Sequence, residues 1–331
     1  MKKQNRHTDV SQCVHCGKCT KSCAFLSKYG IDIGNTEKLS ELSYHCFLCG
    51  KCSEACPVGI DGRQIIWDMR RRQVRDNGGA PPGGGYGMLL WEKKDYRFRN
   101  YKNGGTESVL FPGCNFPSFY PETTRYVSRL LWEKAGIGTV YDCCGKPVAE
   151  LGLENEEARI LEDLSKRLEG SGVKEIIVLC PNCYAFFAGR LSVKIVSIYE
   201  KLKELGLGQA VEGTVRIFPP CPDREGKELL AHIKPFLTEE PEVLTDSQCC
   251  GLGGCGSIRE PALAAEMSGH YAGKDGTICT YCGSCSGNLV RGGHKETEHL
   301  LVKILGREER ADTKRSLPNR IKTKYRKEKR V

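Results

Sequence analysis

The sequence has no long hydrophobic run. Nowhere are about 18 or more apolar residues consecutive, so no segment is expected to cross a bilayer. The N-terminal residues Met1 to Gln4 are basic, but no apolar run follows them, and a secretory signal peptide is not expected. Aromatic residues make up only 8% of the chain and form no aromatic-rich platform, so nucleic acid is not expected as a partner. These absences favour a cytoplasmic protein.

Uncompensated charge is also scarce, except at the C-terminal end. Residues 307–331 hold eleven Lys or Arg and four Asp or Glu, a balance of +7, whereas the whole chain has a net charge of +9. The rest of the chain is therefore close to neutral. We expect this basic tail to be solvated and disordered. Its alternative role is a contact with an acidic protein, or with anionic lipid at the inner face of the membrane.

Cysteine, by contrast, is abundant, with 20 residues in a chain of 331. In a short secreted chain this count would predict disulfides. In a larger chain, clustered Cys-x-x-Cys spacing favours metal binding in a reducing compartment. The length allows two or three domains.

Two cysteine clusters lie near the N-terminus, in residues 13–23 and 46–56. Both have the spacing C-x2-C-x2-C-x3-C, and Pro57 follows the second. This spacing is typical of two-cluster bacterial ferredoxins, in which three cysteines bind one cubane and the fourth binds the other. The predicted ligands of the first [4Fe-4S] cubane are Cys13, Cys16, Cys19 and Cys56, and those of the second are Cys46, Cys49, Cys52 and Cys23. Zinc is the alternative, although it rarely uses three thiols at this spacing.

Single residues in these two loops are also informative. Gly17 and Gly50 are expected to let the backbone turn so that successive thiolates point inward. His15 and His45 are interpreted as ordinary loop histidines, because four thiols per cubane are already supplied.

A second pattern repeats in the rest of the chain. Its first copy comprises Cys114, Cys143, Cys144, Cys180 and Cys183, and its second copy comprises Cys221, Cys249, Cys250, Cys279 and Cys282. Equivalent cysteines lie 107 (114 to 221), 106 (143 to 249) and 99 (180 to 279) residues apart, which indicates an internal duplication. Adjacent cysteines could bind two irons of an open cluster. The alternatives are a vicinal disulfide and a cubane with one spare thiol.

Two cysteines and a glycine motif remain outside these sets. Cys255 and Cys285 are interpreted as buried small residues, with free thiols or cluster neighbours as alternatives. Gly251, Gly253 and Gly256 match the dinucleotide fingerprint only weakly. We expect these glycines to let the backbone approach a cluster closely rather than to bind a nucleotide.

Strand and helix patterns alternate after a glycine-rich segment. Strands are expected at 108–114, 140–143 and 175–180, with helices at 123–135 and 154–168, and a second series follows with strands at 215–221, 242–245 and 276–279 and a helix from 225. The predicted fold is a multidomain α+β and α/β protein, in which an α-helical ferredoxin-like domain precedes two pseudo-symmetric α/β domains. The predicted parts are a ferredoxin-like domain at 1–75, a linker at 76–107, α/β domains at 108–213 and 214–306, and a basic tail at 307–331.

The cysteine motifs resemble those of a known family. Residues 114–183 and 221–282 resemble the tandem CCG domains of the heterodisulfide reductase B subunit, and residues 13–57 resemble its ferredoxin-like C subunit. The C-then-B order resembles the fused D subunit. The chain is similar also to iron–sulfur subunits of anaerobic glycerol-3-phosphate dehydrogenase, glycolate oxidase and lactate-utilisation systems.

The resemblance implies a function. It implies that each complete five-cysteine motif holds a noncubane [4Fe-4S] cluster, giving one or two such clusters, and that a small disulfide is cleaved between them. Electrons would arrive through the cubanes from a flavoprotein or a membrane cytochrome. All ten motif positions are filled, which favours the reductase over quinone-linked relatives that lack a ligand. Two departures are the shorter gap between Cys250 and Cys279, 28 residues against 35 in the first copy, and the third thiol at Cys285.

Two other functions remain open. The chain could be an electron-transfer subunit that links a flavin dehydrogenase to quinone or ferredoxin without substrate chemistry of its own. A scaffold with decayed clusters is disfavoured, because every ligand position is filled.

Overall fold

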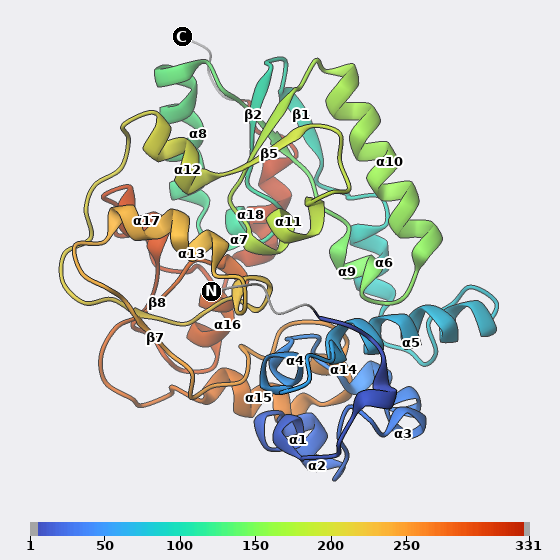
Figure 1. Cartoon of the computed structure of the whole chain (residues 1–331). Coiled ribbons are helices and arrows are strands. Elements are labelled where there is room, and N and C mark those ends of the chain that lie inside the picture. The colour runs from blue at the N-terminus through green and yellow to red at the C-terminus, as the bar shows by residue number, and fades with distance from the viewer. Residues whose placement is uncertain (1–5, 328–331) are drawn as a thin grey trace.

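The N-terminal unit is built from short helices around cysteine-bearing loops. The computed structural model (Figure 1) describes residues 6–327. The helices of this unit are α1 (Lys18–Ser22), α2 (Ala24–Lys28), α3 (Thr36–Glu41), α4 (Lys51–Ala55) and α5 (Gly62–Asp76). Helix α5 begins after Asp61, whose carboxylate accepts from the backbone N–H groups of Arg63 and Gln64. Phe25, Leu26 and Ile60 are among the residues of its core.

The first sheet has five strands, in the order β1-β3-β2-β4-β5. They are β1 (Asn100–Asn103), β2 (Ser108–Phe111), β3 (Gly138–Tyr141), β4 (Glu175–Val178) and β5 (Lys194–Ser197). All pairs are parallel except β1 with β3. Helices α8 (Pro121–Ala135) and α10 (Glu154–Gly170) follow β2 and β3, close to the predicted ranges. Strands β3 and β4 are buried throughout, as expected for a parallel sheet covered on both faces.

The second sheet has four parallel strands, in the order β7-β6-β8-β9. They are β6 (Arg216–Ile217), β7 (Glu242–Val243), β8 (Ile278–Thr280) and β9 (Thr297–His299). This order is that of β3, β2, β4 and β5 in the first sheet. The predicted helix from 225 is the short α13 (Glu228–Ile233), and the other helices of this part are α14 (Gly256–Arg259), α15 (Pro261–Gly269), α16 (Gly283–Arg291) and α17 (Leu300–Ile304). The fold is therefore mixed α/β, as predicted.

The two sheets share one hydrophobic core. Leu110 and Ile177 of the first sheet belong to the same buried cluster as Ile217 and Cys279 of the second. Since parallel strands end at one edge of a sheet, the loops that follow β2, β3, β4, β6, β7 and β8 carry the cysteines to corresponding places.

The interpretation of residues 76–107 as a linker is wrong for their second half. Helix α6 (Gly87–Lys93) forms there, and β1 adds an antiparallel edge strand to the first sheet. The cause is burial of aromatic side chains that the glycine-rich composition obscured, because Tyr86, Tyr96 and Phe98 all lie in the interior.

The expectation of a disordered tail is also wrong for much of its length. Helix α18 (Ser316–Thr323) packs on α7 (Phe116–Phe119), and Asn319 and Thr323 are buried. Asn319 donates to the carbonyl of Ser118 over 3.2 Å, and Asn100 of β1 donates to the carbonyl of Thr323 over 2.7 Å. These side-chain hydrogen bonds to backbone explain why a strongly basic segment is ordered. Residues 328–331 lie outside the described part.

Among residues 6–327, no helix is both long enough and apolar enough to pass through a membrane.

Candidate metal centres

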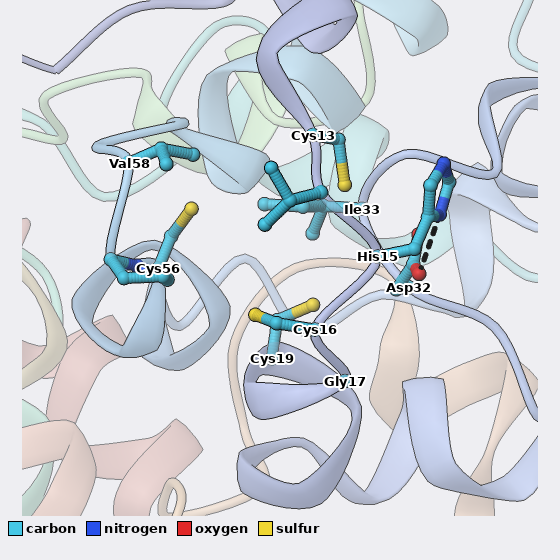
Figure 2. Close-up of a pocket in the computed structure, with 11 residues that line it drawn as sticks. Cys13, His15, Cys16, Gly17, Cys19, Asp32, Ile33, Cys56 and Val58 are labelled. Carbon is cyan, nitrogen blue, oxygen red and sulfur yellow. Dashed lines mark hydrogen bonds and ion pairs between the residues drawn. The ribbon is translucent and has the colours of Figure 1, made fainter.

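Four N-terminal thiols surround one space. Cys13, Cys16, Cys19 and Cys56 line a single cavity, and Figure 2 shows their sulfur atoms directed toward the space between the two loops. Cys56 comes from the second motif and the other three come from the first. This is the grouping predicted for the first cubane.

The other four thiols of this unit also lie together. The pKa of Cys23 is raised by burial and by the charges of Cys49 and Cys46, and the pKa of Cys52 is raised by burial and by Cys23, Cys46 and Cys49. Such mutual effects require short distances between the four sulfur atoms. This is the grouping predicted for the second cubane.

The two loops share an unusual backbone. Gly17 and Gly50 have φ of 71° and 75°, and His15 and Leu48, two residues before them, have φ of 49° and 51°. Two left-handed residues in five turn the chain sharply, and only glycine adopts this region without strain. The loops therefore curl around their thiols, as expected for Gly17 and Gly50.

The surroundings of the thiols fit an iron–sulfur cluster. Leu48 donates its backbone N–H to the sulfur of Cys46 over 3.3 Å, and Ile60 donates to that of Cys56 over 3.4 Å. A Cβ atom at Gly34 would lie 2.7 Å from the sulfur of Cys13, so a larger residue would displace that thiol. N–H donors aimed at sulfur and small residues beside it are what a thiolate-bound cluster requires.

Histidines next to these loops pair with carboxylates. His15 Nδ1 lies 2.9 Å from Asp32, and this pair could join Cys13 on a single metal ion. Cys13 also belongs to the four-thiol group, however, which accounts for it more completely. His45 Nδ1 lies 2.6 Å from Glu260, and no thiol is required to explain its position.

The first five-cysteine set is brought together as predicted. Cys114 and Cys143 have sulfur atoms 3.9 Å apart, whereas Cys144 turns toward Cys183 and Cys180. Cys143 therefore contacts Cys114, Cys144 contacts the Cys-x-x-Cys segment that opens α11 (Pro181–Phe187), and the two adjacent thiols also contact each other.

The second set differs from the prediction at one position. Cys221 and Cys249 have sulfur atoms 3.9 Å apart, and Cys250 interacts with Cys285, which in turn interacts with Cys282. Cys279 lies inside β8 and packs in the core shared by the sheets, where burial raises its pKa to about 12 and the charged groups that affect it are Lys303 and Glu298. The structure separates Cys279 from the thiol group and places Cys285 in it.

The register of β8 explains this correction. Cys180 follows β4 and precedes α11, and Cys282 occupies the same place between β8 and α16. The offset is 102 residues for both thiols (180 to 282 and 183 to 285), so the residue of β4 that corresponds to Cys279 is the buried Ile177. The sequence holds a signal for matching Cys180 with Cys282. That offset of 102 residues is closer to the offsets of the other equivalent cysteines, 106 and 107, than is the offset of 99 between Cys180 and Cys279.

The thiols in each set alter one another's proton affinity. Hydrogen bonds with Cys143 and Cys183 lower the pKa of Cys144 to about 5, and hydrogen bonds with Cys144 and Cys180 raise the pKa of Cys183. A hydrogen bond from Cys249 lowers the pKa of Cys49 to about 6. So many close thiolates repel one another unless a cation lies among them, and bound iron supplies that charge.

The dicluster unit contacts the second cysteine set directly. Besides the Cys49–Cys249 interaction, Gln248 donates to the sulfur atoms of Cys23 and Cys49 over 3.5 and 3.6 Å. Arg224 donates to the carbonyl of Gln248 over 2.7 Å, and its charge is buried beside Cys221, Cys49 and Cys249. Two sulfur-bearing centres therefore meet across this contact.

Two glycines of the weak nucleotide motif, Gly253 and Gly256, belong to the same contact, whereas Gly251 lies against Ala264. A Cβ atom at Gly253 would lie 3.0 Å from the carbonyl oxygen of Phe47, and one at Gly256 would lie 2.7 Å from the Phe47 ring. The absence of a side chain at these two positions thus allows the loop of Cys46 and Phe47 to pack closely against them.

A cavity of about 380 Å³ lies between the two cysteine-rich units. Its walls include thiols of both sets, namely Cys114, Cys144, Cys180, Cys183, Cys221, Cys249, Cys250, Cys282 and Cys285. Cys255, assigned to neither set, is buried at the same cavity next to Tyr86. Here both sets of thiols face a common volume large enough for a small molecule.

Comparison with known families identifies two kinds of cysteine-rich domain in the chain. A model of a 4Fe-4S dicluster domain matches residues 9–60, and a model of a cysteine-rich domain matches twice, at residues 108–188 and 215–290. The chain is an iron–sulfur electron-transfer protein. No curated protein and no solved structure matched it in these comparisons.

The matched ranges agree with the structural units of the iron–sulfur protein. The dicluster match covers both curled loops, and the two cysteine-rich matches cover the two parallel sheets up to β4 and β8. Helices α6 and α18 lie outside all three ranges. The cavity between the sheets therefore has walls that the matched domains do not supply.

Proposed function

We propose that the protein reduces a small disulfide in the cavity between its cysteine-rich domains. The observation that carries this proposal is that thiols of both five-cysteine sets line one cavity of about 380 Å³. A disulfide has two sulfur atoms, and a site between two redox centres can address both of them. The two sheets have the same order of corresponding strands, which supports an origin by duplication and a pseudo-symmetric pair of centres.

The proposed ligand sets follow from the thiol groups. Two cubane [4Fe-4S] clusters are held by Cys13, Cys16, Cys19 and Cys56 and by Cys46, Cys49, Cys52 and Cys23. Noncubane clusters are held by Cys114, Cys143, Cys144, Cys180 and Cys183 and by Cys221, Cys249, Cys250, Cys282 and Cys285. The different further neighbours of Cys143 and Cys144, which are Cys114 and Cys183, support an open cluster.

The overall reaction joins one disulfide, two electrons and two protons to give two thiols. Iron–sulfur clusters supply single-electron storage and a metal that stabilises thiolate. The electrons come from a reduced flavoprotein or a membrane cytochrome, and the protons come from solvent. Val14 and Val58 line the first thiol space and are exposed at 65% and 37%, which makes this face suitable for such a donor.

The chain's own residues organise the path between donor and cavity. Gln248 and Arg224 hold the loop of the second cubane against Cys249. Electrons therefore pass from the dicluster domain into the second cysteine-rich domain first, and from there toward the first domain across the cavity.

The competing function is electron transfer without substrate chemistry. The protein would then link a flavin dehydrogenase to quinone or ferredoxin, and the basic residues of the tail would contact the inner face of the membrane. The exposed Lys322, Lys324 and Lys327 support such a contact. A dehydrogenase that copurifies, and no thiol product, would favour this function.

The test is cluster analysis followed by a disulfide assay. Anaerobically purified protein should contain about 16 irons with equal sulfide, as expected for four [4Fe-4S] clusters. A paramagnetic signal should appear when thiol is added to the oxidised protein, and chemically reduced protein should convert a disulfide into two thiols. About 8 to 12 irons with no thiol-dependent signal and no thiol product would refute the reductase function.

A further inference from the structure

We propose that the acceptor carries an oxyanion, such as a carboxylate or phosphate, and that Arg291 and Arg320 bind it at one end of the cavity. This inference rests on the proposed reduction of a disulfide at this site, and it specifies the class of disulfide.

The cavity wall carries more positive than negative charge at this end. Lys93 of α6, Arg291 at the end of α16 and Arg320 of α18 all line it. Lys93 and Arg320 share a single carboxylate, that of Glu92, at 2.7 and 3.2 Å. Glu92 itself does not line the cavity. The other cation of the wall, Lys146, is neutralised by Glu150.

Arg291 has no acidic partner within 4.0 Å among residues 6–327. It donates to the hydroxyl of Ser316 over 2.9 Å and to the carbonyl of Thr313 over 3.3 Å, and its guanidinium stacks on Phe119. These neutral contacts hold the guanidinium in place and leave its charge uncompensated. At this end of the cavity, three cationic side chains therefore share a single carboxylate.

Two of these cations are buried and have a nitrogen atom that makes no well-aligned hydrogen bond. The side chains of Lys93 and Arg320 are exposed by only 8% and 16%. Neither Lys93 Nζ nor Arg320 Nε donates a hydrogen bond of good geometry within the described chain. Both atoms lie close to the Glu92 carboxylate without a well-aligned hydrogen bond to it, and an oxyanion in the cavity would offer them a strong charge-assisted hydrogen bond.

The position of Arg320 relates the anion to the thiols. Arg320 donates to Asn115 Oδ1 over 3.4 Å, and Asn115 Nδ2 donates to Ser284 Oγ over 2.6 Å. Asn115 follows Cys114, and Ser284 lies between Cys282 and Cys285. An anion bound at Arg320 therefore places the remainder of a short molecule between the two thiol sets, where its disulfide would react.

Lys93 also lies beside the thiols of the first set, so a substitution of Lys93 is a less specific test of anion binding. Its ammonium group faces Cys114 and Cys143, so removing it would also disturb the thiols of the first set. The charge of Arg320 also lowers the pKa of Cys114, whereas Arg291 is not among the groups that affect Cys114 or Cys143, so Arg291 gives the cleanest test. All three cations lie outside the ranges matched by the cysteine-rich domain model, 108–188 and 215–290. Acceptor choice is thus assigned to residues that flank the two domains.

The experiment compares two disulfides that differ in charge. Reduced viologen serves as donor, 3,3′-dithiodipropionate as the anionic acceptor and bis(2-hydroxyethyl) disulfide as the neutral one. The native protein should prefer the anionic acceptor in kcat/KM. Arg320→Gln and Arg291→Gln should each lower kcat/KM for it by about 10-fold or more, as expected for a lost charge-assisted hydrogen bond, and change the neutral acceptor less than about two-fold. Lys322→Gln, exposed on the same helix, is the matched control.

Binding is measured separately with thiodipropionate, a dianionic thioether that cannot be reduced. Calorimetry should detect binding to the native protein and about 10-fold weaker binding to Arg320→Gln, with iron content unchanged. Equal kcat/KM for both disulfides, with no effect of Arg320→Gln on either acceptor or on thioether binding, would overturn the anion site and leave the reductase intact. Reduction of neither disulfide, with thioether binding that depends on Arg320, would overturn the reductase and retain the anion site.

Discussion

Gln248 donates its side-chain amide to the sulfur of Cys23 over 3.5 Å, although 225 residues separate the two in the chain. The same nitrogen lies 3.6 Å from the sulfur of Cys49, and the amide oxygen accepts the backbone N–H of Ala24 over 2.6 Å. Gln248 directly precedes Cys249 of the second cysteine-rich set. A single side chain of one domain therefore bonds to two candidate ligands of a cluster in another.

Replacing Gln248 by Leu should lower the midpoint potential of the second cubane. N–H···S hydrogen bonds stabilise the more negative, reduced form of a cluster, so their loss disfavours reduction. A change of about 60 mV corresponds to a ten-fold change in a one-electron equilibrium, and we expect a shift of this order. An EPR-monitored redox titration measures it. Gln64→Leu, on the α5 surface and bonded to Asp68, should leave the potential unchanged. An unaltered potential in Gln248→Leu would exclude this role.

Cys285→Ser should reduce the iron content, whereas Cys279→Val should not. Cys285 interacts with Cys250 and Cys282, but Cys279 lies inside β8 at the position that Ile177 occupies in β4. Valine suits a buried strand of this kind. Iron and acid-labile sulfide per chain provide the measurement. Loss of iron on Cys279→Val, with full iron in Cys285→Ser, would restore the assignment made from the sequence.

Glu260→Ala should destabilise the contact between the dicluster domain and the second cysteine-rich domain. The buried carboxylate accepts from Lys28, Tyr29 and His45 at 2.5, 2.7 and 2.6 Å. Loss of an acceptor that serves several donors should cost about 2 kcal/mol. Thermal unfolding of cluster-loaded protein would register a lower Tm. The exposed Glu266→Ala on α15 serves as control, and equal Tm values for the two variants would contradict the prediction.

His299→Asn should weaken the dependence of stability on acid. Burial against Phe116 and Tyr120 lowers the pKa of His299 to about 3. Below about pH 6.5 the His299 side chain is protonated in the unfolded chain but stays neutral in the folded chain. The contribution of His299 to the free energy of unfolding is therefore complete above that pH and is lost as the pH falls. Between pH 6.5 and 5.5 the native protein should lose about 1 kcal/mol more than the variant. Asn keeps an acceptor for the Leu301 N–H, and denaturant unfolding at both pH values provides the comparison.

The dicluster domain could be predicted from the sequence almost completely. The ligands of a cubane lie within a few residues of one another, so their spacing carries the geometry. In the structure, Cys56 of the second motif lies with the first three thiols of the first motif, and Cys23 lies with those of the second. The spacing pattern predicts this arrangement, because the fourth cysteine of each motif binds the other cluster.

The second cysteine-rich set could be predicted only in part. Cys279, Cys282 and Cys285 form two overlapping Cys-x-x-Cys pairs, and local spacing does not distinguish them. The choice depends on where β8 ends, which is fixed by its pairing with β6 and β9. Non-local pairing of short strands is a feature that a sequence pattern records poorly.

The segments around the cavity were least predictable. Helix α6 follows a run of glycines, and α18 lies in a run of basic residues, so composition indicated a linker and a disordered tail. Both are ordered by distant partners, such as Glu92 with Arg320 and Asn100 with Thr323. Contacts between the two ends of a chain have no local signature.

Helix α18 also sets the order in which the site can be completed during synthesis. Ser316 and Arg320 form part of the cavity wall, and they emerge from the ribosome after every cysteine of the chain. Until then the thiols of both cysteine-rich domains remain open on that side to the machinery that delivers iron and sulfide. The helix that closes this side of the cavity is therefore synthesised after all the thiols that line it.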